Sequence, residues 1–369
     1  MILYFDYAAT SPMKKEALDV YIEAARCFSG NTSSPHDEGT RASLLLEQCR
    51  TEIASLAGVL KDGIYFTGSG TEGNILALLS FARNKPKKHI ITGMAEHTSV
   101  HSAMTILQSE GFNITKLPLN EYGVVTVESV KAAICSDTAL ISIQHINPEI
   151  GTIQPVEQIA VEAKKRGILF HTDCVQSFGK VPLHALHADA MTFSAHKIGG
   201  PKGCGAVYLS PFQSVSPVFP GLMHEKGIRG GTVDTPAIAA FAEAAKTAAS
   251  LEKLWTLRHL LKEKLNGSSI KWIEGNDSNQ YPGVIGMCIP GIEGQLVMLA
   301  LNAQNMYIST GSACDASSAT GMKAALAMGM TIEEARQFFR LSFGPETTES
   351  EVIKLAQALL HVAAQAVML

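Results

Sequence analysis

The feature that most constrains the fold is a regular alternation between short apolar runs and longer helical patterns. The apolar runs are rich in β-branched and aromatic residues, and most are followed by a stretch with the period of a helix. The runs that read as strands are GIYFT, HIITG, NITKLPL, TALISIQ, ILFHTD, TFSA and GAVYLS, between residues 63 and 210. Because this alternation is typical of βαβ units, the sequence predicts an α/β fold with a mainly parallel, buried sheet.

The pattern changes after residue 250 to a helix, LEKLWTLRHLLKEKL, then antiparallel-looking strands in SIKWIE and VIGMCI, another helix and the run FFRLSF. A chain of 369 residues is long enough for two hydrophobic cores. We therefore expect a large domain over 15–250 and a smaller α+β domain built from 1–14 and 251–369.

Composition excludes several classes of protein. Hydrophobic residues make up 46% of the chain and charged residues 17%, which favours a compact enzyme over a disordered or fibrous protein. The net charge of -4 argues against nucleic acid as the main partner. The start, MILYFDYAAT, is not a secretory signal, and no uncharged apolar run is long enough to span a bilayer, so we expect a cytoplasmic protein.

The seven cysteines are an odd number without CxxC spacing. This pattern favours neither a disulfide framework nor a metal site. A cysteine that matters should therefore act as a thiol.

Polar side chains follow two of the predicted strands at the point where each strand ends. Asp173 ends ILFHTD and is followed by Gln176, while TFSA leads directly into SAHKIGGPKG with Lys197. In open parallel sheets, ligands bind beyond the carboxyl ends of the strands. If the chain is extended at 194–197, Ser194 and His196 point to one side and Lys197 to the other.

The stretch GSGTEG at 68–73 also follows a strand and opens a helix. It matches the dinucleotide pattern G-x-G-x-x-G, with Glu96 near the place of a ribose-binding acid. It can equally be a tight turn capped by Thr71, or a helix N-terminus that binds one phosphate group.

Together these strand-end groups favour one kind of ligand. An aldehyde cofactor with a phosphate tail and a pyridine nitrogen needs an amine for a Schiff base, a carboxylate for the ring nitrogen and donors for the phosphate. Pyridoxal phosphate has this chemistry, so Lys197 is interpreted as the amine that meets its aldehyde.

In these motifs and their order, the chain resembles the NifS/IscS-type cysteine desulfurases, a class V aminotransferase family of fold-type I pyridoxal-phosphate enzymes. The matching stretches run through nearly the whole chain: YFDYAATSPM, GNTSSPH, TGSGTEGN, MAEHTSVH, HTDCVQSFGK, SAHKIGGPKG, HEKGIRGGT, STGSAC and FRLSFG. The resemblance implies a large domain with a seven-stranded sheet and a small domain that carries the catalytic cysteine loop.

The resemblance also implies roles for the cofactor-binding residues. Lys197 would form the Schiff base, Asp173 would pair with the pyridine nitrogen, Gln176 would bind the ring hydroxyl and His97 would stack on the ring. The implied phosphate ligands are Gly70, Thr71, Ser194 and His196, with Thr232 supplied by the neighbouring subunit of a homodimer.

For the substrate, the resemblance implies that Arg340 and Asn31 bind L-cysteine and that Cys314 accepts its sulfur as a persulfide, with release of L-alanine. Lys197 would move the α-proton, and His97 the proton of the substrate thiol. The sulfur would then pass to an acceptor protein for iron–sulfur cluster assembly or tRNA thiolation.

The chain departs from the family pattern at Asn147-Pro148-Glu149, where the family commonly has Asn-Asn-Glu. Proline cannot make the contact of the second asparagine with cofactor and substrate. Either Asn147 takes its place at the cofactor, or substrate binding rests more on Arg340.

Three other functions stay open at this point. Another pyridoxal-phosphate lyase or aminotransferase would share Lys197 and Asp173 but would not depend on Cys314. A dehydrogenase would use GSGTEG and leave Lys197 unexplained. A non-catalytic relative would act only as a binding partner in sulfur traffic.

Overall fold

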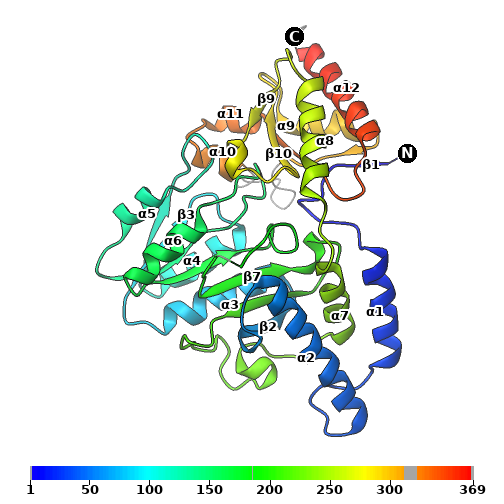
Figure 1. Ribbon diagram of the computed structural model, residues 1–369. Helices are drawn as coiled ribbons and strands as arrows, with labels where there is room; N and C mark the ends of the chain where they lie inside the picture. The colour runs from blue at the N-terminus through cyan, green and yellow to red at the C-terminus, as the bar shows by residue number, and fades with distance from the viewer. Residues whose placement is uncertain (1, 185, 311–321, 367–369) are drawn as a thin grey trace.

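The computed structural model describes residues 2–184, 186–310 and 322–366. Figure 1 shows two parts, with the seven-stranded sheet and its helices in the lower one and both described ends of the chain in the upper one. Cys314, which the sequence predicts to accept the sulfur, lies outside the described residues.

The large sheet has the strand order β2-β8-β7-β6-β5-β3-β4. β8 runs antiparallel to both of its neighbours, and the other pairs are parallel, which confirms the prediction of a mainly parallel sheet. The strands are β2 (Ile64–Thr67), β3 (His89–Gly93), β4 (Asn113–Leu117), β5 (Thr138–Ser142), β6 (Leu169–Asp173), β7 (Ala190–Ser194) and β8 (Gly205–Leu209).

Helices cover both faces of this sheet, as expected for strands that are apolar along their whole length. Neighbouring strand residues such as Leu140 and Ile141 belong to different hydrophobic clusters, one on each face. One cluster contains residues of α3 (Gly70–Arg83) and α4 (Thr98–Ser109). The other contains residues of α1 (Lys15–Cys27), α2 (Asp37–Ala57), α5 (Val127–Ala133), α6 (Val156–Lys165) and α7 (Thr235–Ala245).

The second part is built on an antiparallel sheet with the order β12-β10-β9 and on a parallel pair, β1 with β11. Its strands are β1 (Leu3–Tyr4), β9 (Lys271–Ile273), β10 (Val284–Cys288), β11 (Met306–Tyr307) and β12 (Phe338–Ser342). Its helices are α8 (Leu251–Lys264), α9 (Gly294–Asn302), α10 (Lys323–Ala327), α11 (Ile332–Arg336) and α12 (Glu349–Ala366).

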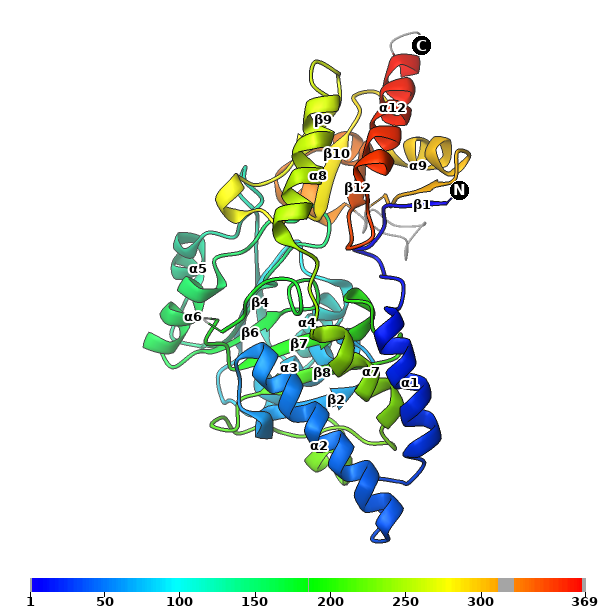
Figure 2. The same cartoon turned by 45° about the vertical axis from the view of Figure 1, so that its right-hand side comes forward.

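A separate hydrophobic cluster holds most of this second part together, with residues of β1, α8, β10, α9 and α12. Figure 2 shows β9, β10 and β12 beside α8, α9 and α12, above the large sheet. Ile273 and Phe338, however, join the cluster of the large sheet. The division at residue 250 stays a prediction.

Residues 5–13, which we call the N-terminal strap, connect the two parts. The backbone N–H of Ala8 donates to the hydroxyl of Ser342 at 2.9 Å, so the strap begins against β12. The N–H of Ser11 donates to the carbonyl of His196 at 2.8 Å, just beyond the end of β7. The strap therefore passes the carboxyl end of the large sheet, where the sequence places its candidate residues.

Candidate active site

A cavity of about 260 Å³ lies at the carboxyl ends of β6 and β7, beside the N-terminal strap. Nearly all the residues predicted to bind the cofactor share its wall, together with side chains that the sequence did not single out. The lining residues are Ala9, Ser69, Gly70, Thr71, Asn74, His97, Gln144, Ile146, Pro148, Asp173, Val175, Gln176, Ser194, His196 and Lys197.

Asp173 is a buried carboxylate held by two donors. The side-chain amide of Asn74 donates to its Oδ2 at 2.7 Å, and the backbone N–H of Val175 donates to its Oδ1 at 2.9 Å. Each carboxylate oxygen can accept more than one hydrogen bond, so both remain able to accept from a ligand. A fixed carboxylate at the cavity wall suits a cationic N–H group.

Lys197 enters the cavity from a turn of 3₁₀ helix, Ala195–Lys197. The predicted extended chain at 194–197, with Lys197 facing away from Ser194 and His196, is therefore wrong, and the turn brings all three side chains to one cavity. The Lys197 ammonium donates to the carbonyls of Ala8 and Ala9 in the strap, at 2.8 and 2.7 Å. These carbonyls hold the amine at the cavity wall.

The end of the cavity near α3 is suited to an anion. The hydroxyl of Ser194 is buried and has no hydrogen-bond partner among the described residues. The first backbone N–H groups of a helix also lack partners within the helix, and α3 begins at Gly70 with Ser69 as its cap. A Cβ atom at Gly70 would lie 2.6 Å from the Val175 side chain. Glycine at this position therefore lets the start of α3 lie close to Val175, which also lines the cavity.

His196 lies between this end of the cavity and the strap. Its Nδ1 is 3.1 Å from the hydroxyl of Thr10. Burial lowers the pKa of His196 to about 4, and the nearby Lys197 contributes in the same direction. The ring is therefore neutral at pH 7 and takes part as a hydrogen-bonding group.

His97 caps the start of α4 and is linked to Asp173 through two side chains. Its Nδ1 accepts from the backbone N–H of Ser99 at 3.2 Å and lies 2.7 Å from the Ser99 hydroxyl. Asn74 donates to that hydroxyl at 2.9 Å and also to Asp173. Burial lowers the pKa of His97, and because Nδ1 accepts, the proton of the neutral ring sits on Nε2.

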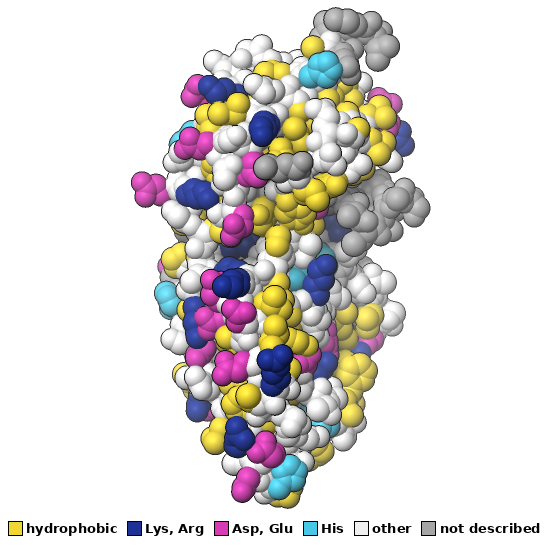
Figure 3. All heavy atoms as spheres, turned by 90° about the vertical axis from the view of Figure 1, so that its right-hand side faces the viewer, with side chains coloured by type: hydrophobic (Ala, Val, Ile, Leu, Met, Phe, Trp, Pro, Cys, Tyr) yellow, Lys and Arg dark blue, Asp and Glu magenta, His cyan; other side chains and the backbone are white. Residues whose placement is uncertain are grey.

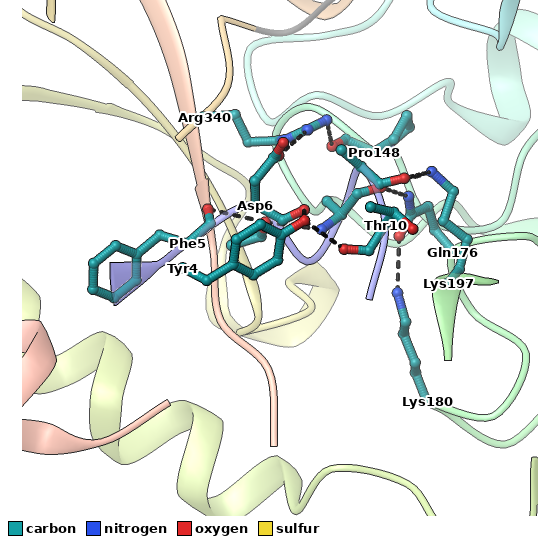
Figure 4. A network of polar contacts seen from close by, with 12 residues as sticks. Tyr4, Phe5, Asp6, Thr10, Pro148, Gln176, Lys180, Lys197 and Arg340 are labelled. Carbon is teal, nitrogen blue, oxygen red and sulfur yellow. Dashed lines mark hydrogen bonds and ion pairs between the residues drawn. The ribbon is translucent and has the colours of Figure 1, made fainter. Parts of the chain in front are cut away.

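Arg340 lies in β12 just behind the cavity wall formed by Pro148. Its guanidinium donates to Oδ1 of Asp6 at 2.7 Å and to the carbonyl of Pro148 at 3.0 Å, while its buried Nε has no partner among the described residues. Figure 4 shows this group beside the strap, with Arg340, Asp6 and Pro148 together. Two of the three guanidinium nitrogens are thus already engaged within the protein.

Asn147 is fully buried and does not belong to the cavity wall of the described residues. Its Oδ1 accepts from the backbone N–H groups of Glu149 and Ile150 at 2.8 and 3.0 Å, so the carboxamide holds its own loop. Its Nδ2 is buried without a partner among the described residues. Pro148, the next residue, does line the cavity, and a role for Asn147 at a cofactor stays a prediction.

Two candidate residues, Asn31 and Thr232, lie elsewhere. Both line a surface hollow beside α7, together with Gly30 and Asp234, and neither lines the cavity that holds Lys197. Sequence reasoning grouped them with the active site without placing Asn31 on a particular subunit.

Several residues of the site were not identified from the sequence. Asn74 follows Gly70 by one helical turn and therefore faces the same side of α3, which was a usable signal. Lys180 follows Gln176 by four residues, and its Nζ donates to the Gln176 Oε1 at 2.9 Å. No sequence pattern indicated Asp6 or the carbonyls of Ala8 and Ala9, because their partners lie far along the chain.

The residues that the structure describes contain no cluster of three side chains arranged to hold a metal ion. None of the described helices is both long and apolar enough to cross a membrane. The cytoplasmic location stays a prediction.

The two-part α/β architecture and the cavity with Lys197 and Asp173 are those expected of a pyridoxal-phosphate enzyme of fold type I. The comparison with known families agrees with this class. The chain belongs to the class-V aminotransferase family, whose profile matches residues 3–355. Members of this family use pyridoxal phosphate.

Within this family the chain is similar to NifS and IscS proteins. It is 41% identical to a NifS protein of Bacillus subtilis over 98% of this chain and 93% of that protein. It is 36% identical to the cysteine desulfurase IscS of Dictyoglomus turgidum, over 95% of this chain and 91% of that protein.

Solved structures similar to this chain include proteins of the same kind. A NifS-like protein superimposes with a TM-score of 0.90 and 31% identity, covering 99% of this chain and all of that one. A structure described as SspA in complex with cysteine has a TM-score of 0.82 at 31% identity and covers 94% of this chain. The predictions of family and fold are confirmed.

Proposed function

We propose that this protein is a pyridoxal-phosphate-dependent cysteine desulfurase, which converts L-cysteine to L-alanine and keeps the sulfur as a persulfide on Cys314. The observation that carries the proposal is that Lys197, Asp173 and Ser194 line one cavity, where the Ser194 hydroxyl has no partner among the residues that the structure describes. An amine, a fixed carboxylate and an anion-binding end are what this cofactor requires.

Different residues of the described chain would bind different parts of the cofactor. Ser194, His196 and the start of α3 at Gly70 and Thr71 would hold the phosphate, and Asp173 would hold the ring nitrogen. His97 and Gln176 line the cavity between these ends. When bound, pyridoxal phosphate supplies an aldehyde for the amine of Lys197 or of the substrate, and a ring that withdraws electrons from the α-carbon.

The chain's own groups move the protons. Lys197 takes the α-proton of the substrate at Nζ, and the carbonyls of Ala8 and Ala9 keep that atom at the cavity wall. His97 carries its proton on Nε2 and serves as a donor to the substrate sulfur. Arg340 binds the substrate carboxylate after giving up part of its pairing with Asp6 and Pro148.

In the sulfur-transfer step the Cys314 thiolate attacks the sulfur of the substrate. An S–S bond forms, the bond between sulfur and the β-carbon breaks, and the electron pair of that bond stays with the carbon. A proton, equivalent to the one that the Cys314 thiol has lost, then completes the methyl group, and Lys197 returns the α-proton to give alanine. No external oxidant or reductant is needed. Cys314 lies outside the described residues, and its role is proposed from the STGSAC motif.

The described residues on either side of 311–321 support this role for Cys314. On one side, Ser309 and Arg340 exchange two backbone hydrogen bonds, at 3.1 and 2.7 Å. On the other, the N–H of Ala324 donates to the Glu149 carboxyl at 2.8 Å, next to Pro148 in the cavity wall. The segment with Cys314 therefore leaves and rejoins the described chain beside the proposed substrate site.

We also propose a homodimer in which Asn31 and Thr232 complete the site of the partner subunit. Both residues are exposed and line one hollow away from Lys197 of their own chain. Large apolar side chains are exposed on α1 (Leu18 and Ile22) and on the segment before Thr232 (Phe212 and Met223). Figure 3 looks at the side that bears α1, where hydrophobic and charged side chains alternate.

The persulfide would then be passed to an acceptor protein for iron–sulfur cluster assembly or tRNA thiolation. The reaction itself calls for such a partner, because the sulfur stays on Cys314 until a second thiol attacks it.

The experiment that tests the proposal is Cys314→Ser in the purified holoenzyme. Alanine production from L-cysteine should fall by at least about a hundredfold, because a hydroxyl is a far poorer nucleophile toward sulfur than a thiolate. Cofactor absorption and its change on adding L-cysteine should persist, since the cavity is untouched. Cys135→Ser, at an exposed cysteine, is the matched control and should keep full activity.

In the unaltered enzyme, labelled sulfur from cysteine should appear on the peptide that contains Cys314 and be removed by a reducing agent. Normal alanine release by the serine variant, or label on Cys174 or Cys204 instead, would favour a lyase that does not use Cys314.

A further inference from the structure

Lys180 lies outside the cavity wall but contacts a residue that belongs to it. The chain turns directly after β6, and Gln176 and Lys180 are four residues apart in these turns. The Lys180 ammonium donates to the Gln176 Oε1 at 2.9 Å. On its other side, the Gln176 Nε2 donates to the carbonyl of Ala8 at 2.7 Å. Figure 4 shows Gln176 with Lys180 and Lys197 from close by.

These two contacts fix the orientation of the Gln176 amide by chemistry. An amide side chain normally has two orientations that are hard to distinguish, because its oxygen and nitrogen have the same shape. A lysine ammonium can only donate and a backbone carbonyl can only accept. The Gln176 oxygen must therefore face Lys180, and its NH₂ group must face the Ala8 carbonyl, to which the Lys197 ammonium also donates.

Lys180 also brings a positive charge close to Lys197. Both residues line a second cavity of about 240 Å³, whose wall includes Tyr7, Ala8 and Ser11 of the strap. Burial lowers the pKa of Lys180 to about 7, with Lys197 and Arg340 contributing in the same direction. The other charged or titratable groups that line this cavity are Tyr7, Lys14, Lys15, Tyr281 and Glu346.

We propose that Lys180 is a positioning residue that turns the Gln176 amide so that its NH₂ group, and not its oxygen, faces the ring oxygen of the bound cofactor. This inference rests on the proposed function, since it concerns how the chain holds pyridoxal phosphate. A ring oxygen that carries negative charge is stabilised by an N–H donor and repelled by an amide oxygen. Gln176 is useful at this position only in the orientation that Lys180 and the Ala8 carbonyl together impose.

Three substitutions at Lys180 separate orientation from bulk and charge. Lys180→Arg keeps a group that only donates and should behave like the unaltered protein. Lys180→Met removes the donor to the amide oxygen and leaves only the Ala8 carbonyl to hold the orientation of the amide. Lys180→Glu puts an acceptor beside Gln176, which favours the reversed amide. Lys15→Met removes the same charge from the same cavity without touching Gln176, and is the matched control.

The measurements are the rate at which the holoenzyme loses pyridoxal phosphate and the pH at which the absorption of the bound cofactor changes. Lys180→Met should lose cofactor about tenfold faster and shift that pH upward by about one unit, because the ring oxygen loses a donor. Lys180→Glu should exceed both effects, and Lys180→Arg and Lys15→Met should show neither.

Two results would overturn the inference while the proposed function stands. In one, Lys180→Met retains cofactor with unchanged spectra in a protein whose unaltered form binds it. In the other, all three Lys180 variants lose cofactor equally, which indicates a role in packing alone. If the unaltered chain does not bind pyridoxal phosphate on Lys197, both the inference and the proposed function are wrong.

Discussion

The cofactor side and the substrate side of the cavity differ in how their polar groups are partnered. On the cofactor side, the buried Ser194 hydroxyl has no partner among the described residues, and Asp173 is held by donors that leave it able to accept more. On the substrate side, Arg340 is already paired with Asp6 and the Pro148 carbonyl. The first side is prepared for a ligand, whereas the second must exchange partners to bind one.

The largest effect should come from removing the amine of Lys197 on the cofactor side. Lys197→Ala should abolish covalent attachment of the cofactor and lower turnover about a thousandfold, because no other group at this position can capture the aldehyde or move the α-proton. Borohydride reduction and peptide mapping measure the attachment. Lys202→Ala, at an exposed lysine of the same glycine-rich stretch, should change neither quantity. Attachment to another lysine would contradict the assignment.

On the substrate side, Arg340→Lys should raise KM for L-cysteine about 10- to 100-fold while the cofactor stays bound. Lysine keeps the charge but loses the planar fork that holds a carboxylate by two hydrogen bonds. Steady-state kinetics over a wide range of L-cysteine concentration measure the change, with Arg336→Lys on the exposed side of α11 as the control. An unchanged KM would mean that the carboxylate is bound elsewhere.

Ser194→Ala and Ser142→Ala together compare a buried hydroxyl proposed to bind the cofactor with a buried hydroxyl that already has a partner in the protein. Ser194→Ala should weaken cofactor binding about tenfold and leave the stability of the cofactor-free protein nearly unchanged. Ser142 is equally buried, but its hydroxyl lies 2.9 Å from the ring of His171. Ser142→Ala should therefore lower the free energy of unfolding by about 1–2 kcal/mol and spare cofactor affinity. Denaturant unfolding and cofactor titration together measure both, and the opposite assignment of effects would refute the comparison.

The smallest effect is expected from a substitution at Asp6, and this substitution should strengthen the binding of L-cysteine. Asp6→Asn keeps an oxygen that can accept from Arg340 but removes the negative charge that competes with the substrate carboxylate. KM for L-cysteine should fall about threefold, as expected for a weakened ion pair. A higher KM in this variant would show that Asp6 orients Arg340 for the substrate and does not compete with it.

The sequence predicted the cofactor side better than the substrate side, and the reason is physical. Asp173 and Lys197 follow strands of one sheet, and parallel strands bring their carboxyl ends to a common edge. Their approximate meeting therefore follows from the strand pattern alone. The local geometry did not follow, since the 3₁₀ turn at Ala195–Lys197 replaced the expected extended chain.

The substrate side depends on contacts that no local pattern encodes. Asp6 meets Arg340 across 334 residues of chain, and Lys197 meets the carbonyl of Ala8 across 189. Both pairings require the strap to cross between two parts of the molecule, which a single sequence does not reveal. The same is true of Asn31 and Thr232, whose proposed partners lie on another subunit.

The N-terminal strap also sets the order in which the site can be completed during synthesis. The strap leaves the ribosome before the rest of the site, and Arg340 and Ser342, which bind it, follow 334 residues after their partners Asp6 and Ala8. Lys197 emerges midway and already finds Ala8 and Ala9 available. A nascent chain can thus assemble its cofactor side long before its substrate side, and it completes the Asp6–Arg340 pair only after β12 has been made.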